Sequence, residues 1–305
     1  MYPEFPYFKP VELLDRDVIH GFFRDYLPET SELTFTNLYI WRDHYGFQWT
    51  IYDDWLLIIY SVGGNLHALP PVGRPSRSDV VVILLEWLKE EMGSKEPFID
   101  RADGRLLSEV EGVEILLAEP TRDQFDYVYE SSALIGLAGK KYSSKRQQIN
   151  RFKRKYGFEY RPMERDDLME CRELAGRWCD IRRCDEDMNL MDEWSSVNEA
   201  LENFGELGLS GGMVMVDGRM EAFAMGEKLN ERTAVIHIEK ANTGIEGLYT
   251  LINQQFAENH WHDIEFINRE QDLGVPGLRQ AKLSYHPVRM VKKYTIRKRY
   301  ESDQK

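Results

Sequence analysis

No stretch of this 305-residue sequence is both long and apolar enough to cross a membrane. The longest apolar runs, WLLIIY at 55–60 and DVVVILLEWL at 79–88, are shorter than the roughly 18–20 residues that a span requires. The opening residues, MYPEFPYFKP, lack the basic start and the apolar region of a secretory signal. We therefore expect no transmembrane segment and a cytoplasmic location.

Cysteine is scarce, with only Cys171, Cys179 and Cys184 present. An odd number of cysteines without a secretory signal predicts reduced, buried thiols rather than disulfides. The stretch CRELAGRWCDIRRC at 171–184 contains no CxxC pair and offers no fourth ligand at a zinc spacing. We therefore expect no metal site.

The motifs of several common enzyme classes are also missing. The chain has no HExxH, P-loop or Rossmann fingerprint, and no serine-histidine-aspartate arrangement. Apolar residues make up 42% and charged residues 30%, which is an ordinary globular composition. Because 305 residues is about twice the length of a typical domain, we expect two folded domains.

The order of the expected elements repeats along the chain. The first half predicts two helices, three strands, a long helix, a strand, a short helix and a closing pair of strands, near 11–26, 36–45, 47–52, 55–61, 65–69, 79–93, 97–102, 104–112, 113–119 and 123–130. The second half predicts two helices, a hairpin, a strand, a helix, a strand, a short helix and a last strand, near 166–183, 191–208, 211–229, 233–241, 244–260, 263–270, 276–285 and 289–300.

PFIDRADG at 97–104 matches EFINREQD at 265–272, so the chain reads as a tandem duplication. A helix between two strands implies a crossover connection and a mixed sheet in each copy. The predicted class is α/β or α+β. The expected division is a domain at 1–139, a basic connecting helix at 140–160 and a second domain at 161–305.

This element order resembles the GNAT acyltransferase fold, in which a strand-to-helix loop binds the pyrophosphate of the cofactor at a helix N-terminus. In the second half that loop is KANTGIEG at 240–247, where Gly244 and Gly247 permit close backbone approach and Lys240 supplies charge. Tyr249 follows in the helix and completes the expected donor-binding segment. The alternative is an ordinary turn and helix cap.

Three segments resemble one family more narrowly: YVYESSALIGLAGKKYSSKRQQINRFKRKY, IHIEKANTGIEGLYTLINQQFA and FINREQDLGVPGLRQAKLSYHPVRMVKKY. They are similar to bacterial proteins grouped with the C-terminal domain of phosphatidylglycerol lysyltransferase, over roughly residues 30–300. The resemblance implies two tandem GNAT-like domains related to the Fem peptidyltransferases, each a mixed twisted sheet flanked by helices.

The same resemblance implies an acyl- or aminoacyltransferase without an obligatory cofactor. Its donor would carry phosphate, as charged tRNA or acyl-CoA does, and its acceptor would be an amine or hydroxyl of a small molecule, a lipid or a peptide. The alternative is a GNAT-derived binding or regulatory protein without catalysis. The acceptor and the transferred group stay open.

A basic segment stands out in a chain whose net charge is −13. GKKYSSKRQQINRFKRKYG at 139–157 contains no acid, and a capping box of Ser144 and Gln147 with an apolar stripe of Ile149, Phe152 and Tyr156 predicts a helix. Its cations suit a tRNA backbone, the phosphates of CoA or peripheral contact with an anionic membrane. A linker helix that pairs with acidic neighbours is the alternative. The expected polyanion-binding residues are Lys145, Arg146, Arg151, Lys153 and Arg154.

Acyl transfer needs a base for the acceptor proton and donors for the oxyanion. Alternation along strand 233–241 puts His237 and Glu239 on one face, so either is a candidate base. Asn268 and Glu270 follow at the end of the next strand, where open α/β sheets border a ligand crevice. We expect Asn268 to donate to the oxyanion and Glu270 to act as a base or to bind an ammonium group.

The short helix GLRQAKLSYHP at 277–287 adds three further candidates. Arg279 and Lys282 are three residues apart and share a helix face, where they could hold a donor phosphate or carboxylate. Tyr285 is the candidate general acid. Asn268 and Arg269 have Asp100 and Arg101 as counterparts in the first copy. An architectural role is therefore the alternative for Asn268 and Arg269.

Overall fold

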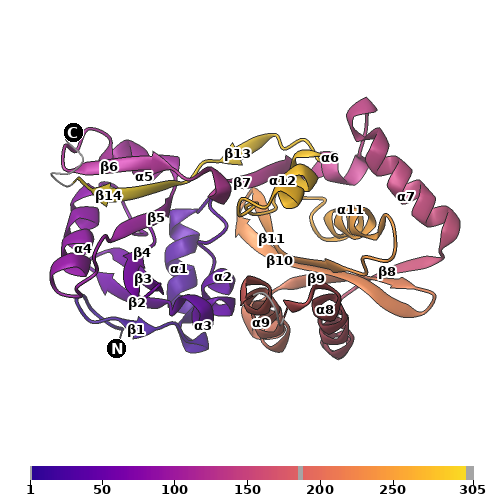
Figure 1. Ribbon diagram of the computed structural model, residues 1–305, viewed down its shortest axis with the longest axis horizontal. Helices are drawn as coiled ribbons and strands as arrows, with labels where there is room; N and C mark the ends of the chain where they lie inside the picture. Colours follow the sequence, from indigo (N-terminus) through magenta and orange to yellow (C-terminus); the bar gives the residue numbers. More distant parts are fainter. Residues whose placement is uncertain (1, 185–187, 300–305) are drawn as a thin grey trace. The chain divides into compact units, whose positions relative to one another are not determined.

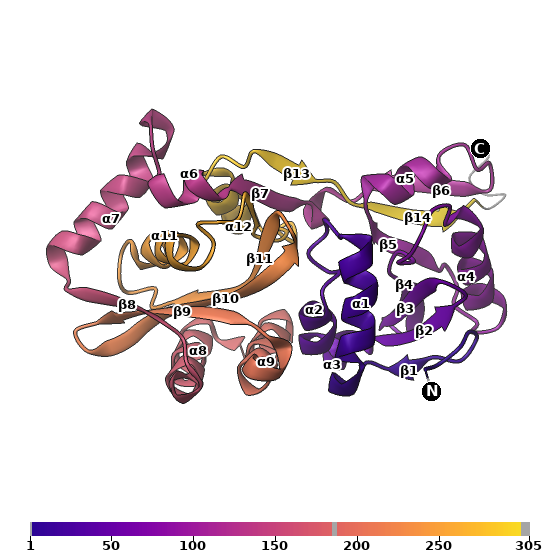
Figure 2. The ribbon, with the colours of Figure 1, turned by 180° about the vertical axis from the view of Figure 1, so that it is seen from behind.

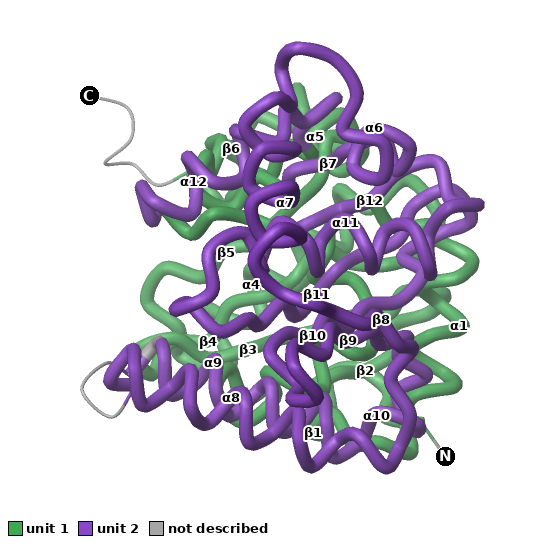
Figure 3. The backbone as a smooth tube through the Cα atoms, turned by 90° about the vertical axis from the view of Figure 1, so that its right-hand side faces the viewer, with its two compact units in different colours: residues 1–126, 271–274, 291–305 green, residues 127–270, 275–290 purple. Residues whose placement is uncertain are grey.

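The computed structural model describes residues 2–184 and 188–299 and divides into two compact units (Figure 1, Figure 3). Unit 1 comprises residues 1–126, 271–274 and 291–305, and unit 2 comprises 127–270 and 275–290. The units are therefore not the contiguous domains expected at 1–139 and 161–305. Within the described ranges, no helix has both the length and the apolar character that crossing a bilayer requires.

Unit 1 is built on a seven-stranded mixed sheet in the order β1-β2-β3-β4-β5-β14-β6. Its elements, with η for a 3-10 helix, are β1 (Lys9–Pro10), η1 (Leu13–Asp15), α1 (Arg16–Tyr26), α2 (Phe35–Ile40), α3 (Arg42–Tyr45), β2 (Gln48–Tyr52), β3 (Trp55–Val62), β4 (Asn65–Ala68), α4 (Ser78–Glu90), β5 (Phe98–Ala102), α5 (Gly104–Val110), β6 (Leu116–Pro120), η2 (Arg122–Gln124) and β14 (Tyr294–Lys298).

The core of unit 1 forms where α4 and α5 cover the sheet. Helix α4 presents Val81, Leu84, Leu85 and Leu88 at helical spacing, and all four are buried. They pack with residues of β3, β5 and β14 in one cluster. Strands β4 and β5 are parallel neighbours, and α4 connects them as the crossover expected from the sequence.

Unit 2 has a second seven-stranded mixed sheet, in the order β13-β7-β12-β11-β10-β9-β8. Its elements are β7 (Asp126–Glu130), α6 (Ser131–Gly136), η3 (Lys140–Tyr142), α7 (Ser143–Lys155), β8 (Phe158–Pro162), η4 (Arg165–Asp167), α8 (Leu168–Arg182), α9 (Met188–Glu202), α10 (Phe204–Leu207), β9 (Ser210–Val216), β10 (Arg219–Asn230), β11 (Thr233–Ala241), α11 (Leu248–His260), β12 (Phe266–Asn268), α12 (Pro276–Leu283) and β13 (Arg289–Val291).

Helices cover both faces of the sheet in unit 2. Helix α11 lies on one side of β9, β10 and β11, and α8 and α9 lie on the other (Figure 1, Figure 2). The core on the α11 side includes Leu251 and Phe256 of α11 together with Ile149 and Phe152 of α7. Ile149 and Phe152 of the expected apolar stripe are therefore buried, whereas Tyr156 lies just past the end of α7 and is partly buried. The expected capping box is wrong, because α7 begins at Ser143 without a side-chain cap.

The hairpin expected at 211–229 is confirmed. Strands β9 and β10 pair from Val216 and Arg219, and the two residues between them are Asp217 and Gly218. Both have positive φ values, 50° and 79°, as a two-residue hairpin turn requires.

Two expectations about strand partners are wrong. We expected a closing pair of strands at 113–130, but β6 belongs to the sheet of unit 1 and β7 to the sheet of unit 2. We also expected one strand at 289–300, whose last residue lies outside the described part. That segment instead forms β13 and β14, which join different sheets. Sequence pattern identifies a strand but not its partner, because pairing depends on contacts distant in the chain.

A buried ion network holds the C-terminal segment in unit 1. Lys293 precedes β14, is fully buried, and donates to both carboxylate oxygens of Glu32 at 2.7 and 2.6 Å and to Asp126 at 2.6 Å. Burial lowers the pKa of Lys293, but Asp126 and Glu32 outweigh it and raise that pKa above its usual range. Asp126 also accepts from the backbone N–H of Ser31 at 2.8 Å.

The expectation of three reduced thiols is wrong. Cys179 and Cys184 form a disulfide with Cα atoms 5.2 Å apart, whereas Cys171 is free and buried. Helix α8 ends at Arg182, and Arg183 adopts a left-handed conformation with φ 53°. This reversal brings Cys184 back to Cys179, which cysteine spacing alone does not predict. The described residues contain no group of three His, Cys, Asp or Glu side chains arranged to hold a metal ion.

Candidate functional site

Strands β11 and β12 part after a short parallel contact. They pair over three residues, ending with Val235 opposite Asn268, and β12 stops there while β11 continues. In the pairing of β11 with β10, Ile236 and Ile238 oppose consecutive β10 residues, so the register skips His237. A β-bulge therefore lies where the two strands diverge, and bulges often re-aim side chains next to functional sites.

His237 lies between two carboxylates. Its ring nitrogens are 2.8 Å from Glu270 Oε1 and 3.0 Å from Glu227 Oε1, and its side chain is buried. Burial lowers the pKa of His237, but the hydrogen bonds to Glu227 and Glu270 outweigh burial and raise it to about 9. At neutral pH the ring is an imidazolium that donates to both partners. His237 therefore positions Glu270 and cannot act as a base while it is protonated.

Replacing His237 with glutamine should make stability less dependent on pH. The folded-state pKa is raised from 6.5 to about 9, so His237 contributes full stability below about pH 6.5 and loses it as the pH rises through 9. The wild-type advantage in free energy of unfolding should shrink by about 3 kcal/mol between these limits. Urea denaturation of both proteins at a series of pH values measures it. If the difference in free energy of unfolding between the wild type and the variant did not change with pH, His237 would not be charged in the folded protein.

Glu239 forms a separate ion pair across the gap that opens between β11 and the residues after β12. It accepts hydrogen bonds from the guanidinium of Arg269 and from Asn253 Nδ2 of α11, the latter at 3.0 Å. Arg269 lies over the rings of Tyr285, at 4.8 Å, and Tyr129, at 5.8 Å. The shared face expected for His237 and Glu239 is not observed, because the bulge shifts the alternation of β11 and the two side chains contact different residues.

Side chains bridge the gap between the ends of β11 and β12. Two side-chain contacts, His237 with Glu270 and Glu239 with Arg269, bridge β11 to the residues that follow β12. The Nε and Nη1 atoms of Arg269 are buried without a hydrogen-bond partner. Such buried donors are costly, so the bridge is a place where an acceptor oxygen would improve hydrogen bonding.

Glu270 keeps one reactive oxygen. Its Oε1 accepts from His237, while no hydrogen bond or ion pair within residues 2–184 and 188–299 engages Oε2, and the side chain is 21% exposed. Its backbone has φ 56°, and its N–H donates to Asn268 Oδ1 at 2.8 Å. Asn268 is fully buried and uses its side chain to hold this turn. The structure thus gives Asn268 a positioning contact and leaves Glu270 accessible.

Tyr285 and Lys145 lie side by side in the interior of unit 2. Lys145 Nζ is 3.9 Å from the centroid of the Tyr285 ring, and the two residues are 8% and 6% exposed. Burial, together with the charge of Arg269, lowers the pKa of Lys145 to about 8. Burial raises the pKa of Tyr285, so its hydroxyl stays protonated. Lys145 is therefore part of this cluster rather than of an exposed cationic face.

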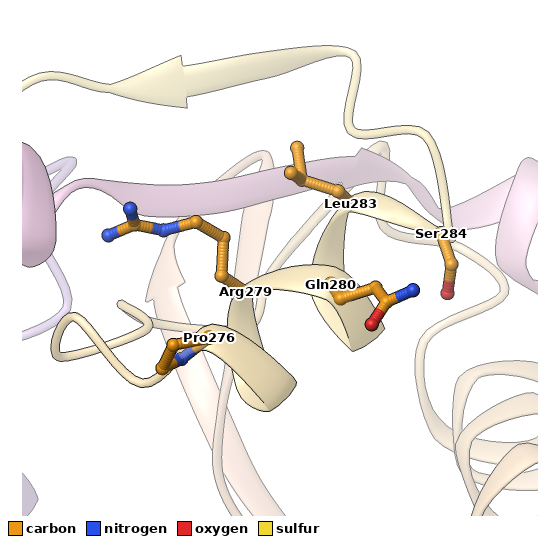
Figure 4. A pocket seen from close by; sticks show the side chains of 5 residues that line it. All are labelled: Pro276, Arg279, Gln280, Leu283 and Ser284. Carbon is orange, nitrogen blue, oxygen red and sulfur yellow. The ribbon is translucent and has the colours of Figure 1, made fainter.

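The cations of α12 have unlike surroundings. Lys282 donates to the backbone carbonyls of Arg269 and Glu270, and it thereby holds the turn after β12. Arg279 lines an open cavity of about 550 Å³ at α12 with Pro276, Gln280, Leu283 and Ser284 (Figure 4). Lys282 thus has a structural contact with the turn, whereas Arg279 borders the cavity.

The expected donor loop lies between β11 and α11. Gly244 is exposed and donates to Asn242 Oδ1 at 2.9 Å, whereas Gly247 is the N-cap of α11 with φ 86°. A Cβ atom at Gly247 would lie 2.7 Å from the carbonyl oxygen of Gln148 in α7, so no larger residue fits. Thr250 Oγ1 also donates to Gln148 Oε1, at 2.7 Å. Helix α7 therefore packs directly against the start of α11.

Lys240 and Tyr249 contact helices α8 and α9 rather than α7. Lys240 is buried, pairs with Glu193 at 2.5 Å and lies 3.3 Å above the ring of Trp178. Burial lowers the pKa of Lys240. Tyr249 accepts a hydrogen bond from Trp178 Nε1 at 3.1 Å. These contacts stabilise the packing of α8 and α9 on the sheet.

The basic residues of α7 separate into two groups. Arg146 turns inward and caps α6 by donating to the carbonyls of Leu137 and Gly139. Arg151, Lys153, Arg154 and Lys155 of α7 are exposed, as are Lys140 and Lys141 of the preceding η3. Arg151 pairs with Glu246 of the loop before α11 at 3.0 Å, an exposed contact that contributes little to stability. Most of these exposed cations thus lie on the helix that contacts the start of α11.

Comparison with known proteins identifies the family. The profile of the phosphatidylglycerol lysyltransferase C-terminal family matches residues 23–297. The chain belongs to this family. A conserved protein of unknown function from Bacteroides thetaiotaomicron is 35% identical, with a TM-score of 0.90 over 98% of this chain and 100% of that chain.

Two further structures share the fold. The C-terminal domain of a putative lysylphosphatidylglycerol synthetase from Agrobacterium fabrum is 15% identical, with a TM-score of 0.64 over 96% of this chain and 92% of that chain. FemX is 9% identical, with a TM-score of 0.55 over 95% of this chain and 96% of that chain. This family member therefore has the tandem GNAT-like fold, and family and fold both point to the acyl- and aminoacyltransferases.

Sequence reasoning missed several residues of this cluster. Glu227, Asn253 and Gln148 were not singled out, because a single carboxylate or amide on a strand or helix carries no signal by itself. Strand alternation places Arg269 opposite Asn268 and Glu270, and the repeat gives it Arg101 as a counterpart, but neither pattern indicates a role in the site. The structure places Arg101 in a similar setting, buried beside Tyr45 and Tyr60 and paired with Glu32.

Proposed function

We propose that this protein is an acyl- or aminoacyltransferase that works in unit 2. Its donor carries phosphate, as charged tRNA or acyl-CoA does, and its acceptor is an amine or hydroxyl of a small molecule, lipid or peptide. Family membership and the tandem GNAT-like fold support the transferase class. Either donor would place the reaction in the cytoplasm.

One observation carries the proposal: the cationic helix α7 packs against the N-terminus of α11. The N–H groups at a helix start bind phosphate, and Gly247 as N-cap offers no side chain that competes for them. Arg151, Lys153 and Arg154 add positive charge on the adjoining helix. Arg151 would exchange its contact with Glu246 for a donor phosphate.

The chemistry would take place at the end of β12. The acceptor amine or hydroxyl attacks the donor's acyl carbon, the free oxygen of Glu270 takes the acceptor's proton, and the ester or thioester bond to the donor breaks. His237 holds Glu270 in position. Tyr285, which stays protonated, supplies a proton to the leaving oxygen or sulfur. The proton held by Glu270 then passes through solvent to the Tyr285 oxygen, which restores both side chains to their starting state.

Charge reversal on α7 should weaken donor binding. For the variant Arg151→Glu/Arg154→Glu we expect the affinity for charged tRNA or CoA to fall at least about tenfold, and the salt dependence of tRNA binding to become shallower by about one unit for each lost phosphate contact. Isothermal titration at two or more salt concentrations measures both quantities.

The matched control reverses two exposed arginines elsewhere in unit 2. Arg165→Glu/Arg172→Glu changes the net charge equally, and both side chains lie at or near the start of α8, in exposed ion pairs with Glu206 and Glu202. Equal loss of affinity in both variants would mean that only net charge matters, and the proposed site would be wrong.

The side-chain contacts that bridge β11 and the residues after β12 favour a second candidate function, that of a binding or regulatory protein without catalysis. Glu239 already pairs with Arg269, and His237 is protonated, so two candidate catalytic groups are engaged in the structure itself. Under this second candidate, donor binding would remain while transfer was absent. Measuring binding and transfer on the same preparation separates the two functions.

A further inference from the structure

Unit 1 contains a cavity that the proposed transfer reaction does not use. Its volume is about 790 Å³, within the range of small-ligand sites. One face of α1 forms a wall, and the turn between β2 and β3, the loop before α4 and helix α5 form the others.

The start of α4 is occupied by a carboxylate of the chain. Glu109 Oε2 accepts the backbone N–H of Arg77 at 2.7 Å, and the Glu109 carboxylate also receives the Arg77 guanidinium. A carboxylate of the chain therefore lies where an anion binds at a helix N-terminus. Arg77 is only 2% exposed and also donates to the hydroxyl of Tyr26 at 2.6 Å. This part of the cavity wall is a neutral, internally satisfied network.

Unpaired charges of both signs remain in the cavity lining. Within the part of the chain that the structure describes, no hydrogen bond or ion pair engages the side chain of Arg74 or that of Asp54, and both are exposed. Among the described residues, Asp25 pairs only with Arg24, at 3.5 Å, and both of those side chains are mostly exposed. Val18 and Phe22 give the same cavity an apolar wall.

Gly21 is an unusual residue for the wall of this cavity. It lies inside α1, where glycine is less favourable than alanine. A Cβ atom at this position would meet nothing within 4 Å, so close packing does not require glycine. The missing side chain leaves room in the cavity.

We propose that this cavity is a second ligand site, which binds a small zwitterion with an apolar body, of the amino-acid or dipeptide type. The carboxylate of the ligand pairs with Arg74, its ammonium group pairs with Asp54 or Asp25, and its apolar part contacts Val18 and Phe22. The site is independent of the transferase proposal, because no residue of unit 2 contributes to it.

Calorimetric titration of the full chain tests the site with L-leucine and leucyl-leucine as probes. We expect both to bind saturably, and N-acetyl-leucinamide, which lacks both charges, to bind at least about tenfold more weakly. Gly21→Met fills the cavity while improving helix propensity, so it should raise the Tm and weaken both probes by about tenfold or more. Arg74→Ala should weaken the zwitterions without affecting the uncharged analogue.

Gly176→Met is the matched control. Gly176 also lies inside a helix, α8, and a Cβ atom there would meet nothing within 4 Å, but this residue does not line the cavity. The Gly176→Met variant should bind both probes as the wild type does. The proposal would be overturned if neither probe bound saturably at concentrations up to about 10 mM, at which a site with a millimolar dissociation constant is filled. Binding that Gly21→Met leaves unchanged, or displacement of the probes by inorganic pyrophosphate, would also overturn it.

Discussion

Replacing Lys293 with methionine is expected to lower the free energy of unfolding of unit 1 by about 3–5 kcal/mol. The substitution removes the cation that Glu32 and Asp126 share and leaves two buried carboxylates without it. Loss of one partner from a buried ion pair is costly because the remaining charge keeps its desolvation penalty. Urea denaturation followed by tryptophan fluorescence measures the change.

Lys298→Met is the matched control for this prediction. Lys298 lies in β14, five positions further along, and pairs with Glu86 at 2.6 Å, but these side chains are 25% and 44% exposed. An exposed pair of this kind contributes at most about 1 kcal/mol. If Lys293→Met cost no more than Lys298→Met, the buried network would not be what holds β14 in the sheet of unit 1.

Replacing Glu270 with glutamine is expected to reduce the rate of acyl transfer by about 100-fold or more, the usual contribution of a general base. Glutamine keeps the shape of the side chain and the backbone contact to Asn268, but it cannot accept the proton of the acceptor. The measurement is kcat with saturating donor, at a temperature where both proteins are folded.

Two further variants make this result specific. Glu265→Gln alters an exposed carboxylate that pairs with Arg232 just before β12, and it should leave kcat unchanged. His237→Gln should give a smaller loss than Glu270→Gln, because it removes only the group that positions the base. A Glu270→Gln protein with wild-type kcat would exclude Glu270 as the base.

Local features of the fold could be predicted from the sequence. The turn at Asp217 and Gly218 is a hairpin signal within a few residues, and β11 matches its expected range because 233–241 is rich in β-branched and apolar residues. The duplication was also visible, because the matching segments at 97–104 and 265–272 follow similar long helices. Both matched segments contain the end of a crossover strand, as expected.

Features that depend on distant contacts could not be predicted. The last strand joins the first sheet because Lys293 meets Glu32, which lies 261 residues away along the chain. The cations of α7 looked alike in sequence, yet Lys145 and Arg146 turn inward while Arg154 is exposed. The bulge at His237 separated it from Glu239, because strand alternation assumes an unbroken ladder.

The most direct test of the central claim is transfer of a labelled acyl group. The protein is incubated with a cell extract and either a pool of labelled aminoacyl-tRNA or labelled acetyl-CoA. We expect one donor to label an acceptor in the presence of the wild-type protein, with little label when Glu270→Gln replaces it. Absence of protein-dependent label with both donors would contradict a transferase and leave the binding function.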